Sequence, residues 1–262
     1  MAIQPAWAID NHVGPTGWIH LYLGVNLAFS KYTEPSIDIS HKTTYFPGFI
    51  AKLAIDNPEI LPFFAMAQYK NQSGTYNYYG YIQDLRGKRM TYSDSALPVS
   101  KQDFEFISGP IFGMVKLFSG IQYEHYTDRA YTTNDYFYKR ERQSWYWIAG
   151  AGIRYKLEDY RIIDLTGKAK PLIWSRHDSH LSSLGGVWSN APTIKQKQPH
   201  GFRFDLSAKY QYEMLWIEPY FSHTRIGATE FESFTFGSGF KAKIQEPANR
   251  TNEIGINIGI RF

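Results

Sequence analysis

The sequence predicts an all-β protein, a transmembrane antiparallel β-barrel of about ten strands. Three observations predict this fold class: segments in which apolar and polar residues alternate, connections that alternate between short and long, and an aromatic content of 17%. Alternation with a period of two places one face of a strand in an apolar medium and the other face in a polar one. Aromatic girdles and a polar lumen are typical of outer-membrane barrels.

Composition agrees with this fold class and excludes others. The mean hydropathy of the 262-residue chain is negative, as expected when lipid-facing and lumen-facing residues cancel in an average. A run of about 20 apolar residues, which a membrane-spanning helix requires, is absent from the sequence. The sequence has no cysteine, which excludes a disulfide scaffold.

The first residues precede the predicted barrel. We expect residues 1–16 to form an N-terminal segment and residues 17–262 to form the barrel. Ala6-Trp7-Ala8 has the small-x-small form of a signal-peptidase site, but no charged region and long apolar stretch stand before it. A remnant of a signal peptide and a chance match therefore both stay open.

The first half of the chain contains five predicted strands. Residues 18–31 alternate from Ile19 to Phe29, and a second strand near residues 45–55 turns tightly at residues 56–59 into a third at residues 60–70. After a long polar stretch, strands at residues 104–117 and 121–128 are predicted to join at Ser119-Gly120.

The second half contains the remaining strands. Residues 145–157 alternate most clearly, and Glu158-Asp159 turns this strand into residues 161–174. Residues 202–212 connect through Glu213-Met214 to residues 215–226. The last strand carries a wholly apolar face, made of Ile254, Ile256, Ile258, Ile260 and Phe262. We expect it to pair with the first strand, because an open sheet edge is not tolerated in lipid.

The connections alternate in length. Those near residues 56, 119, 158 and 213 are about two to four residues long, and those near residues 34, 86, 133, 190 and 237 are longer. Short periplasmic turns and long outer loops are the pattern of bacterial outer-membrane barrels. A soluble β-sandwich, the alternative, does not sort its connections in this way.

The residues expected to face inward carry charges of both signs. They are Lys52, Glu124, Arg154, Lys156, Asp164, Lys168, Lys170, Arg203, Asp205, Lys209, Glu218 and Arg261. About ten strands leave a narrow bore, which paired long side chains can nearly fill. A structural salt-bridge network is the favoured interpretation, and a cation-lined path for a small anion is the alternative.

Several segments resemble the ten-stranded outer-membrane superfamily that contains the omptin proteases and the Opc adhesins. Gln143-Ser144-Trp145, His200-Gly201-Phe202 and the closing segment from Ile244-Gln245-Glu246-Pro247 are similar to Opc segments. Tyr155-Lys156-Leu157-Glu158-Asp159-Tyr160 is similar to an omptin segment. The resemblance implies an omptin/Opc-like barrel of ten strands. It also implies that the barrel lies in a bacterial outer membrane, with its loops facing the cell exterior.

The omptin resemblance implies an endopeptidase site. Omptins activate water between an Asp-His pair and a pair of acids, and here Asp178 and His180 have the order of the first pair. Asp84 matches one of the two acids, but Ile82 stands where the other is expected. Asp94 or Asp103 are the available substitutes, although no spacing supports either.

The Opc resemblance implies recognition of acidic glycans, and the predicted outer loops are basic. Arg and Lys can bind sulfate or carboxylate, while tyrosine rings can stack on sugar faces. The candidate ligand-binding residues are Tyr79, Tyr81, Arg86, Lys88, Arg89, Lys139, Arg140, Arg142, Arg176, His177, Lys195, Lys197, Lys241 and Lys243.

A surface adhesin for sulfated or sialylated glycans is therefore the first functional hypothesis. A narrow channel for small solutes and an omptin-like endopeptidase are the alternatives, so an enzyme is not the favoured hypothesis. Expected partners are outer-membrane lipid and lipopolysaccharide, an acidic polysaccharide or host surface ligand, and the barrel-assembly machinery through Phe262. We expect no cofactor, no metal and no nucleic acid, although basic residues at the rim could equally contact lipopolysaccharide phosphates.

Overall fold

The computed structural model describes residues 19–35, 39–56, 62–83, 89–128, 138–158, 161–184, 189–236 and 239–262. Among these residues, helices with the length and hydropathy needed to cross a membrane are absent. The strands of the wall are β1 (Ile19–Glu34), β2 (Ile39–Asp56), β3 (Phe63–Gln83), β4 (Arg89–Phe112), β5 (Val115–Asp128), β6 (Lys139–Glu158), β7 (Arg161–His180), β9 (Gly201–Tyr212), β10 (Leu215–Ile226) and β13 (Asn249–Arg261).

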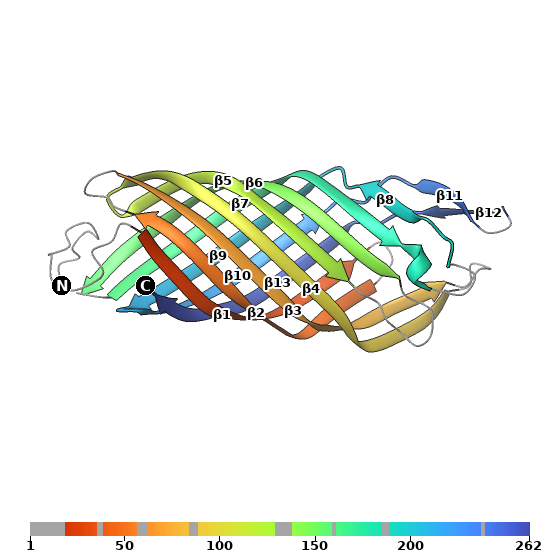
Figure 1. Ribbon diagram of the computed structural model, residues 1–262, viewed down its shortest axis with the longest axis horizontal. Helices are drawn as coiled ribbons and strands as arrows, with labels where there is room; N and C mark the ends of the chain where they lie inside the picture. The colour runs from red at the N-terminus through yellow and green to blue at the C-terminus, as the bar shows by residue number, and fades with distance from the viewer. Residues whose placement is uncertain are drawn as a thin grey trace.

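These ten strands form a closed antiparallel barrel (Figure 1). Each strand pairs with its neighbours in the sheet, and the pairing of β6 with β7 completes the ring. The terminal strand β13 pairs with β1 on one side and β10 on the other, with Ile258 opposite both Val25 and Ile217. The predicted fold class and the predicted pairing of the last strand with the first are confirmed.

Short elements lie at one end of the barrel. They are η1 (Leu181–Leu184), β8 (Thr193–Lys197), β11 (Glu232–Phe236) and β12 (Phe240–Ile244). Strand β8 extends the wall beside the end of β7, while β11 and β12 form a separate hairpin. The carboxyl end and the start of β1 lie at the opposite end (Figure 1). We call the end that carries β8 and the β11–β12 hairpin the mouth.

Strands β3 and β4 are longer than predicted. The stretch at residues 71–103, which we expected to be largely loop, is paired along most of its length. Strands that rise beyond the hydrocarbon can be polar on both faces, so this stretch lacks the alternation that marks the belt. Inside the barrel, Tyr76, Tyr78, Leu97 and Val99 form a buried cluster near the mouth.

Two predicted loops and one predicted turn are wrong. The connections near residues 34 and 86 are short, because β1 ends at Glu34 and β3 ends at Gln83, close to the starts of β2 and β4. The β4–β5 turn lies at Gly113 and not at Ser119-Gly120, since Gly113 has a φ of 59° that favours glycine. Gly120 lies within β5, where an added Cβ would meet the Phe106 carbonyl oxygen at 2.0 Å.

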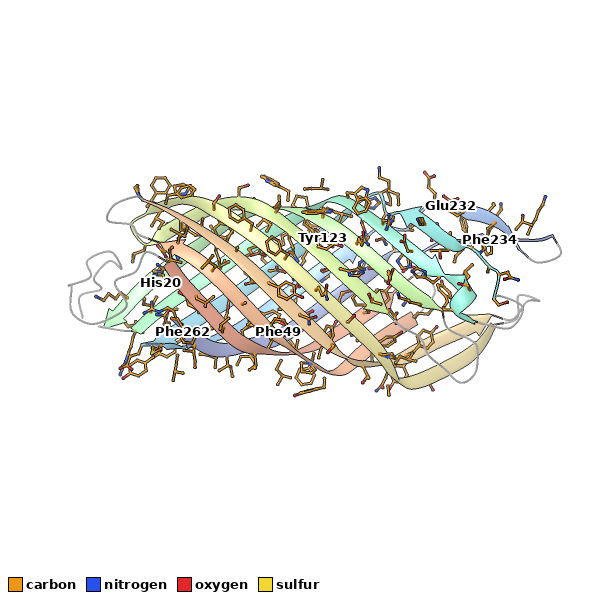
Figure 2. The ribbon with its side chains drawn as sticks, in the orientation of Figure 1. His20, Phe49, Tyr123, Glu232, Phe234 and Phe262 are labelled. Atoms are coloured by element: carbon orange, nitrogen blue, oxygen red, sulfur yellow. The ribbon has the colours of Figure 1, made fainter. Side chains whose placement is uncertain are left out.

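The outer wall carries an apolar belt. Phe49 and Phe262 project from it and are 48% and 52% exposed (Figure 2). One row of outward residues across β1, β13 and β10 is apolar: Phe29, Ile254 and Phe221. The next row towards the mouth is polar, Lys31, Asn252 and His223, and the row above it contains Thr33, Arg250 and Arg225. Such exposure of apolar side chains is stable only against lipid.

Candidate functional site

The lumen is filled by ion pairs at mid-height. Lys101 Nζ lies 3.0 Å from Glu253 and 3.5 Å from Asp103, and Arg203 Nη1 lies 3.0 Å from Glu124. The network continues through Lys70, Glu105, Arg142, Lys168, Lys170 and Asp205. A cavity of about 50 Å³ among these residues has room for a few water molecules. Pairing offsets the cost of burying each charge, as the predicted salt-bridge network requires.

A second group of ion pairs lies nearer the short turns. Arg154 Nε lies 2.8 Å from Asp164 Oδ1, and Lys209 Nζ lies 3.1 Å from Asp164 Oδ2. Lys52 pairs with Glu218 across the lumen. These residues were predicted to face inward from alternation alone, and the structure confirms this.

A cluster inside the mouth is organised by Arg140 of β6. Its guanidinium lies 2.5 Å from Asp128, 3.4 Å from Glu34 and 3.7 Å from Glu246. The Tyr32 hydroxyl donates to Glu34 at 2.7 Å and lies 3.3 Å from Glu246. Glu246 follows the β11–β12 hairpin in the chain, so this cluster joins the base of the hairpin to the barrel.

Burial changes the ionisation of this mouth cluster. Burial and the nearby Glu246 carboxylate together raise the pKa of Glu34 to about 7, against the opposing charge of Arg140. Burial also raises the pKa of Glu246. His177, whose Nε2 lies 3.3 Å from Glu246, has its pKa lowered to about 3 by burial and by the charges of Arg140 and Arg142. The imidazole is therefore neutral at physiological pH.

Three predicted ligand-binding residues belong to the interior. Arg140 is the centre of the mouth cluster, and Arg142 lies 2.9 Å from Glu124 and is 8% exposed. His177 is 4% exposed. A ligand at the outer surface would not reach these groups in this conformation.

Four other predicted ligand-binding residues are exposed lysines. Lys195 and Lys197 lie on β8, while Lys241 and Lys243 lie on β12. None of the four forms an ion pair with any described residue. The alternating residues of β8 are buried instead, and Ile194 packs with Leu181 and Ala191 against Phe234 and Ile244 of the hairpin.

The hairpin therefore has two different faces. Phe234 lies on the face that packs towards β8, and Glu232 belongs to the same alternating set (Figure 2). Lys243 is paired with Ser233 and Lys241 with Thr235 on the other face. This other face carries lysine and hydroxyl groups without an acidic residue.

The remaining candidates differ in their surroundings. Lys139 Nζ lies 2.5 Å from Glu141, and Arg176 Nε lies 3.0 Å from Asp178. Tyr79 on β3 is 47% exposed. The following candidates lie outside the described residues, or have side chains that do: Tyr81, Asp84, Arg86, Lys88 and Arg89.

Asp178 and His180 have other partners and do not form the predicted Asp-His pair. His177 faces the lumen, so alternation places Asp178 and His180 on the outer wall of β7. A register shift at Trp145/Tyr146, where Trp174 and Leu172 are the partners on β7, sets this orientation. The partner of His180 is Glu141 of β6, with 3.1 Å between Nε2 and Oε2.

Sequence reasoning missed several residues that the structure brings together. Glu34, Glu246 and Glu253 neutralise interior cations but lie outside the clearly alternating segments, and Asp128 at the end of the predicted strand 121–128 was not among the residues expected to face inward. Glu141 and Thr193 flank His180 from two other strands. Only the pairing register could have shown these contacts. Among the described residues, no three His, Asp or Glu side chains form a group suited to a metal ion.

Comparisons with known proteins support the fold. No protein-family model matches the chain, and no curated protein matches its sequence. The outer membrane protease OmpT from Escherichia coli is 13% identical with a TM-score of 0.55, and the match covers 93% of this chain and 96% of that one. The translocator domain of autotransporter NalP from Neisseria meningitidis is 9% identical with a TM-score of 0.40, covering 94% and 89% of the two chains.

The attachment invasion locus protein Ail of Yersinia pestis, in complex with the heparin analogue sucrose octasulfate, is 7% identical with a TM-score of 0.38. That match covers 94% of this chain and 100% of the Ail chain. The NalP and Ail likenesses are too distant to support an argument about this chain. With its closed ring of ten strands, its apolar belt and the likeness to OmpT, the chain has the fold of an outer-membrane β-barrel.

Proposed function

We propose that this protein is a bacterial outer-membrane surface protein that binds acidic glycans through basic residues at its mouth. The observation that carries the proposal is the contrast between two groups of cations. Those inside the barrel are paired with carboxylates, whereas Lys195, Lys197, Lys241 and Lys243 are exposed and unpaired among the described residues. Exposed ammonium groups remain available for external anions.

The spacing of these lysines suits a repeating anion. Lys195 and Lys197 are two residues apart on one strand and so lie about 7 Å apart on the same face. Lys241 and Lys243 repeat this arrangement on β12. Sulfate or carboxylate groups along a polysaccharide can contact such pairs, and the exposed ring of Tyr79 offers a surface for sugar stacking.

Retention on immobilised heparin tests this proposal. We expect the detergent-solubilised protein to be retained at low salt and to elute as salt increases, because screening weakens contacts between exposed charges. The double variants Lys195→Gln/Lys197→Gln and Lys241→Gln/Lys243→Gln should elute at lower salt. The matched control Lys31→Gln/Lys156→Gln removes two charges elsewhere on the barrel and should elute with the wild type. Unchanged retention of both mouth variants would contradict the proposal.

The proposal includes an orientation, with the mouth facing the cell exterior. The three longest connections, from β5 to β6, from β7 to β9 and from β10 to β13, lie at the mouth, while three two-residue turns and the carboxyl end lie at the opposite end. Phe262 pairs with Leu21 through both of its backbone groups and leaves its ring 52% exposed. We also propose that this exposed terminal ring is read by the barrel-assembly machinery during insertion.

The two alternatives have less support. The paired charges in the lumen do not favour a path for small solutes. Asp178 pairs with Arg176 and His180 with Glu141, which does not favour the omptin-like arrangement of a water-activating Asp-His pair. We therefore retain glycan binding as the proposed function.

A further inference from the structure

Three polar side chains from three strands meet on the outer wall beside the mouth. His180 lies at the end of β7, directly between β6 and β8 in the strand register, with Thr193 as its cross-strand partner. Its Nδ1 lies 3.2 Å from Thr193 Oγ1, and its Nε2 lies 3.1 Å from Glu141 Oε2. The imidazole thus bridges a hydroxyl and a carboxylate.

The ionisation of Glu141 fixes the direction of both hydrogen bonds. Burial alone would raise the pKa of Glu141, but hydrogen bonds from Lys139 and His180 outweigh this effect and lower the pKa. An ionised carboxylate only accepts hydrogen bonds, so Nε2 must carry the proton and donate it. Nδ1 of a neutral ring is then the acceptor for the Thr193 hydroxyl. This is the order of groups that activates a hydroxyl nucleophile.

The contacts of His180 select the hydroxyl over a free water molecule as the nucleophile. Both ring nitrogens are occupied, one by Glu141 and the other by Thr193. A water molecule would have to displace Thr193 before the imidazole could remove its proton. The side chains of His180 and Glu141 are 26% and 22% exposed, so a reactant can approach from solvent.

Three lysines lie on the same side of the wall as this group. Lys195 and Lys197 share the face of β8 that carries Thr193, because alternate residues of a strand point the same way. Lys139 lies beside Glu141. Lys139 is paired with Glu141, so Lys195, two residues from Thr193, is the nearest lysine without an ion pair among the described residues. Its charge favours a reactant that carries a negative charge and favours the alkoxide that forms when a hydroxyl attacks a carbonyl carbon.

We propose that Thr193, His180 and Glu141 form an esterase site for acyl esters that bear a nearby negative charge. Thr193 Oγ attacks the acyl carbon while His180 Nδ1 takes its proton. The alkoxide collapses, the bond to the alcohol oxygen breaks, and the alcohol leaves with the proton from His180. Water then loses a proton to His180 and attacks the acyl-threonine, which releases the carboxylic acid and restores Thr193. Glu141 acts as a positioning residue.

Hydrolysis of 4-nitrophenyl acetate and of the anionic mono-4-nitrophenyl succinate tests the proposal with the full chain in detergent micelles. Thr193→Ala should lose at least about 100-fold in rate, the scale of one catalytic group. Thr193→Ser should keep activity, because it retains the hydroxyl. The succinate ester should be the better substrate, and Lys195→Gln/Lys197→Gln should remove this preference.

The role of Glu141 needs a separate readout. Glu141→Gln should lower the rate and change the pH at which activity appears, because the amide no longer stabilises protonated His180. Glu232→Gln, which makes the same change at an exposed acid of the hairpin, is the matched control and should keep the wild-type pH profile. An identical profile for Glu141→Gln would remove its positioning role.

Covalent labelling of the wild-type protein with a fluorophosphonate identifies the nucleophile without the need for a variant. A fluorophosphonate should form an adduct on the tryptic peptide that contains Thr193, and mass spectrometry should locate it there. A rate equal to that of empty micelles, or an adduct at another residue, would overturn the proposal. This site does not depend on the proposed glycan binding, since neutral 4-nitrophenyl acetate reports on the chemistry even if heparin retention is absent.

Discussion

Glu34 and Glu246 lie in the same small space inside the mouth. Both carboxylates lie within hydrogen-bond distance of the Tyr32 hydroxyl, which has one proton to donate. Arg140 faces both acids together with Asp128, and the neutral His177 contacts Glu246 from β7. Glu34 and Glu246 share the single charge of Arg140 with Asp128. Two neighbouring buried carboxyl groups are hard to ionise together, so the mouth holds a proton near neutral pH.

This arrangement predicts a pH dependence. Folding raises the pKa of Glu34 to about 7 from the usual 4.5, so the folded state binds more protons between these values. The resulting stability is present below pH 4.5 and is lost as the pH rises through about 7. We expect thermal unfolding in detergent to show a wild type that is less stable at pH 8 than at pH 5.

In the Glu34→Gln variant this difference should shrink, since the amide has no proton to lose. One pKa unit corresponds to about 1.4 kcal/mol, so Glu34 should contribute no more than a few kcal/mol to the difference in unfolding free energy between pH 5 and pH 8. An equal pH dependence in the variant would show that another group is responsible.

The close approach of the β4 backbone to Gly120 leaves no room for a side chain at this position. Gly120→Ala should prevent correct folding, because the new methyl would meet the Phe106 carbonyl oxygen at 2.0 Å. Gly167→Ala is the matched control, since its nearest neighbour would be Leu206 Cδ2 at 3.5 Å, an ordinary contact. The gel mobility of unheated samples in detergent distinguishes folded from unfolded barrels. A folded Gly120→Ala variant would contradict the register of β4 and β5.

Among the strands, β13 must meet two conditions at once: it closes the barrel, and its outer face contacts lipid. It closes the barrel between β1 and β10, and its apolar face is exposed outward, with Ile254 at 62% and Ile258 at 47%. Hydrocarbon is the medium that stabilises such a face, and closure leaves β13 without an unpaired edge. The same strand delivers Glu253 to the lumen.

Substitution on β13 can test the position of the belt. Ile258→Arg should destabilise the protein in lipid bilayers by about 2–4 kcal/mol, the cost of an arginine near the bilayer centre. Asn252→Arg, in the polar row nearer the mouth, should cost about 0–1 kcal/mol. Urea titrations in phospholipid vesicles measure both values. Equal costs would place the belt elsewhere on the wall.

The ion pairs of the lumen act at the scale of the whole molecule. They link strands on opposite sides of the barrel, as Lys101 of β4 and Glu253 of β13 show at 3.0 Å. Removing one member would leave a buried charge without its partner, which costs about 3–5 kcal/mol. The same groups occupy the space through which a solute would pass.

Removing equal numbers of positive and negative charges from the lumen tests whether the ion pairs block the passage of solutes. We expect the wild type to give no stable conductance steps in planar bilayers. Replacing Lys101, Glu124, Arg203 and Glu253 together by serine removes two positive and two negative charges and should open a small conductance. The control with Lys139 and Glu141 replaced by serine removes one pair from the outer wall and should stay closed. Steps of similar size in the wild type would show that the lumen is already open.

The sequence alone determined the membrane-facing part of this protein. A lipid-facing strand must alternate and must pair with neighbours, so the belt, the closing of β13 on β1 and the inward charges could be predicted. Alternation disappears where strands leave the hydrocarbon, and the extensions of β3 and β4 were therefore missed.

Only the tertiary structure decided which charges meet. Arg140 and Arg142 have the sequence context of loop residues, yet their orientation on β6 places them inside the mouth. The register shift between β6 and β7 turns both Asp178 and His180 outward, where His180 contacts Glu141 and Thr193. A register shift of one residue exchanges the two faces of a strand without a clear mark in the sequence, so these partners depend on the assembled sheet.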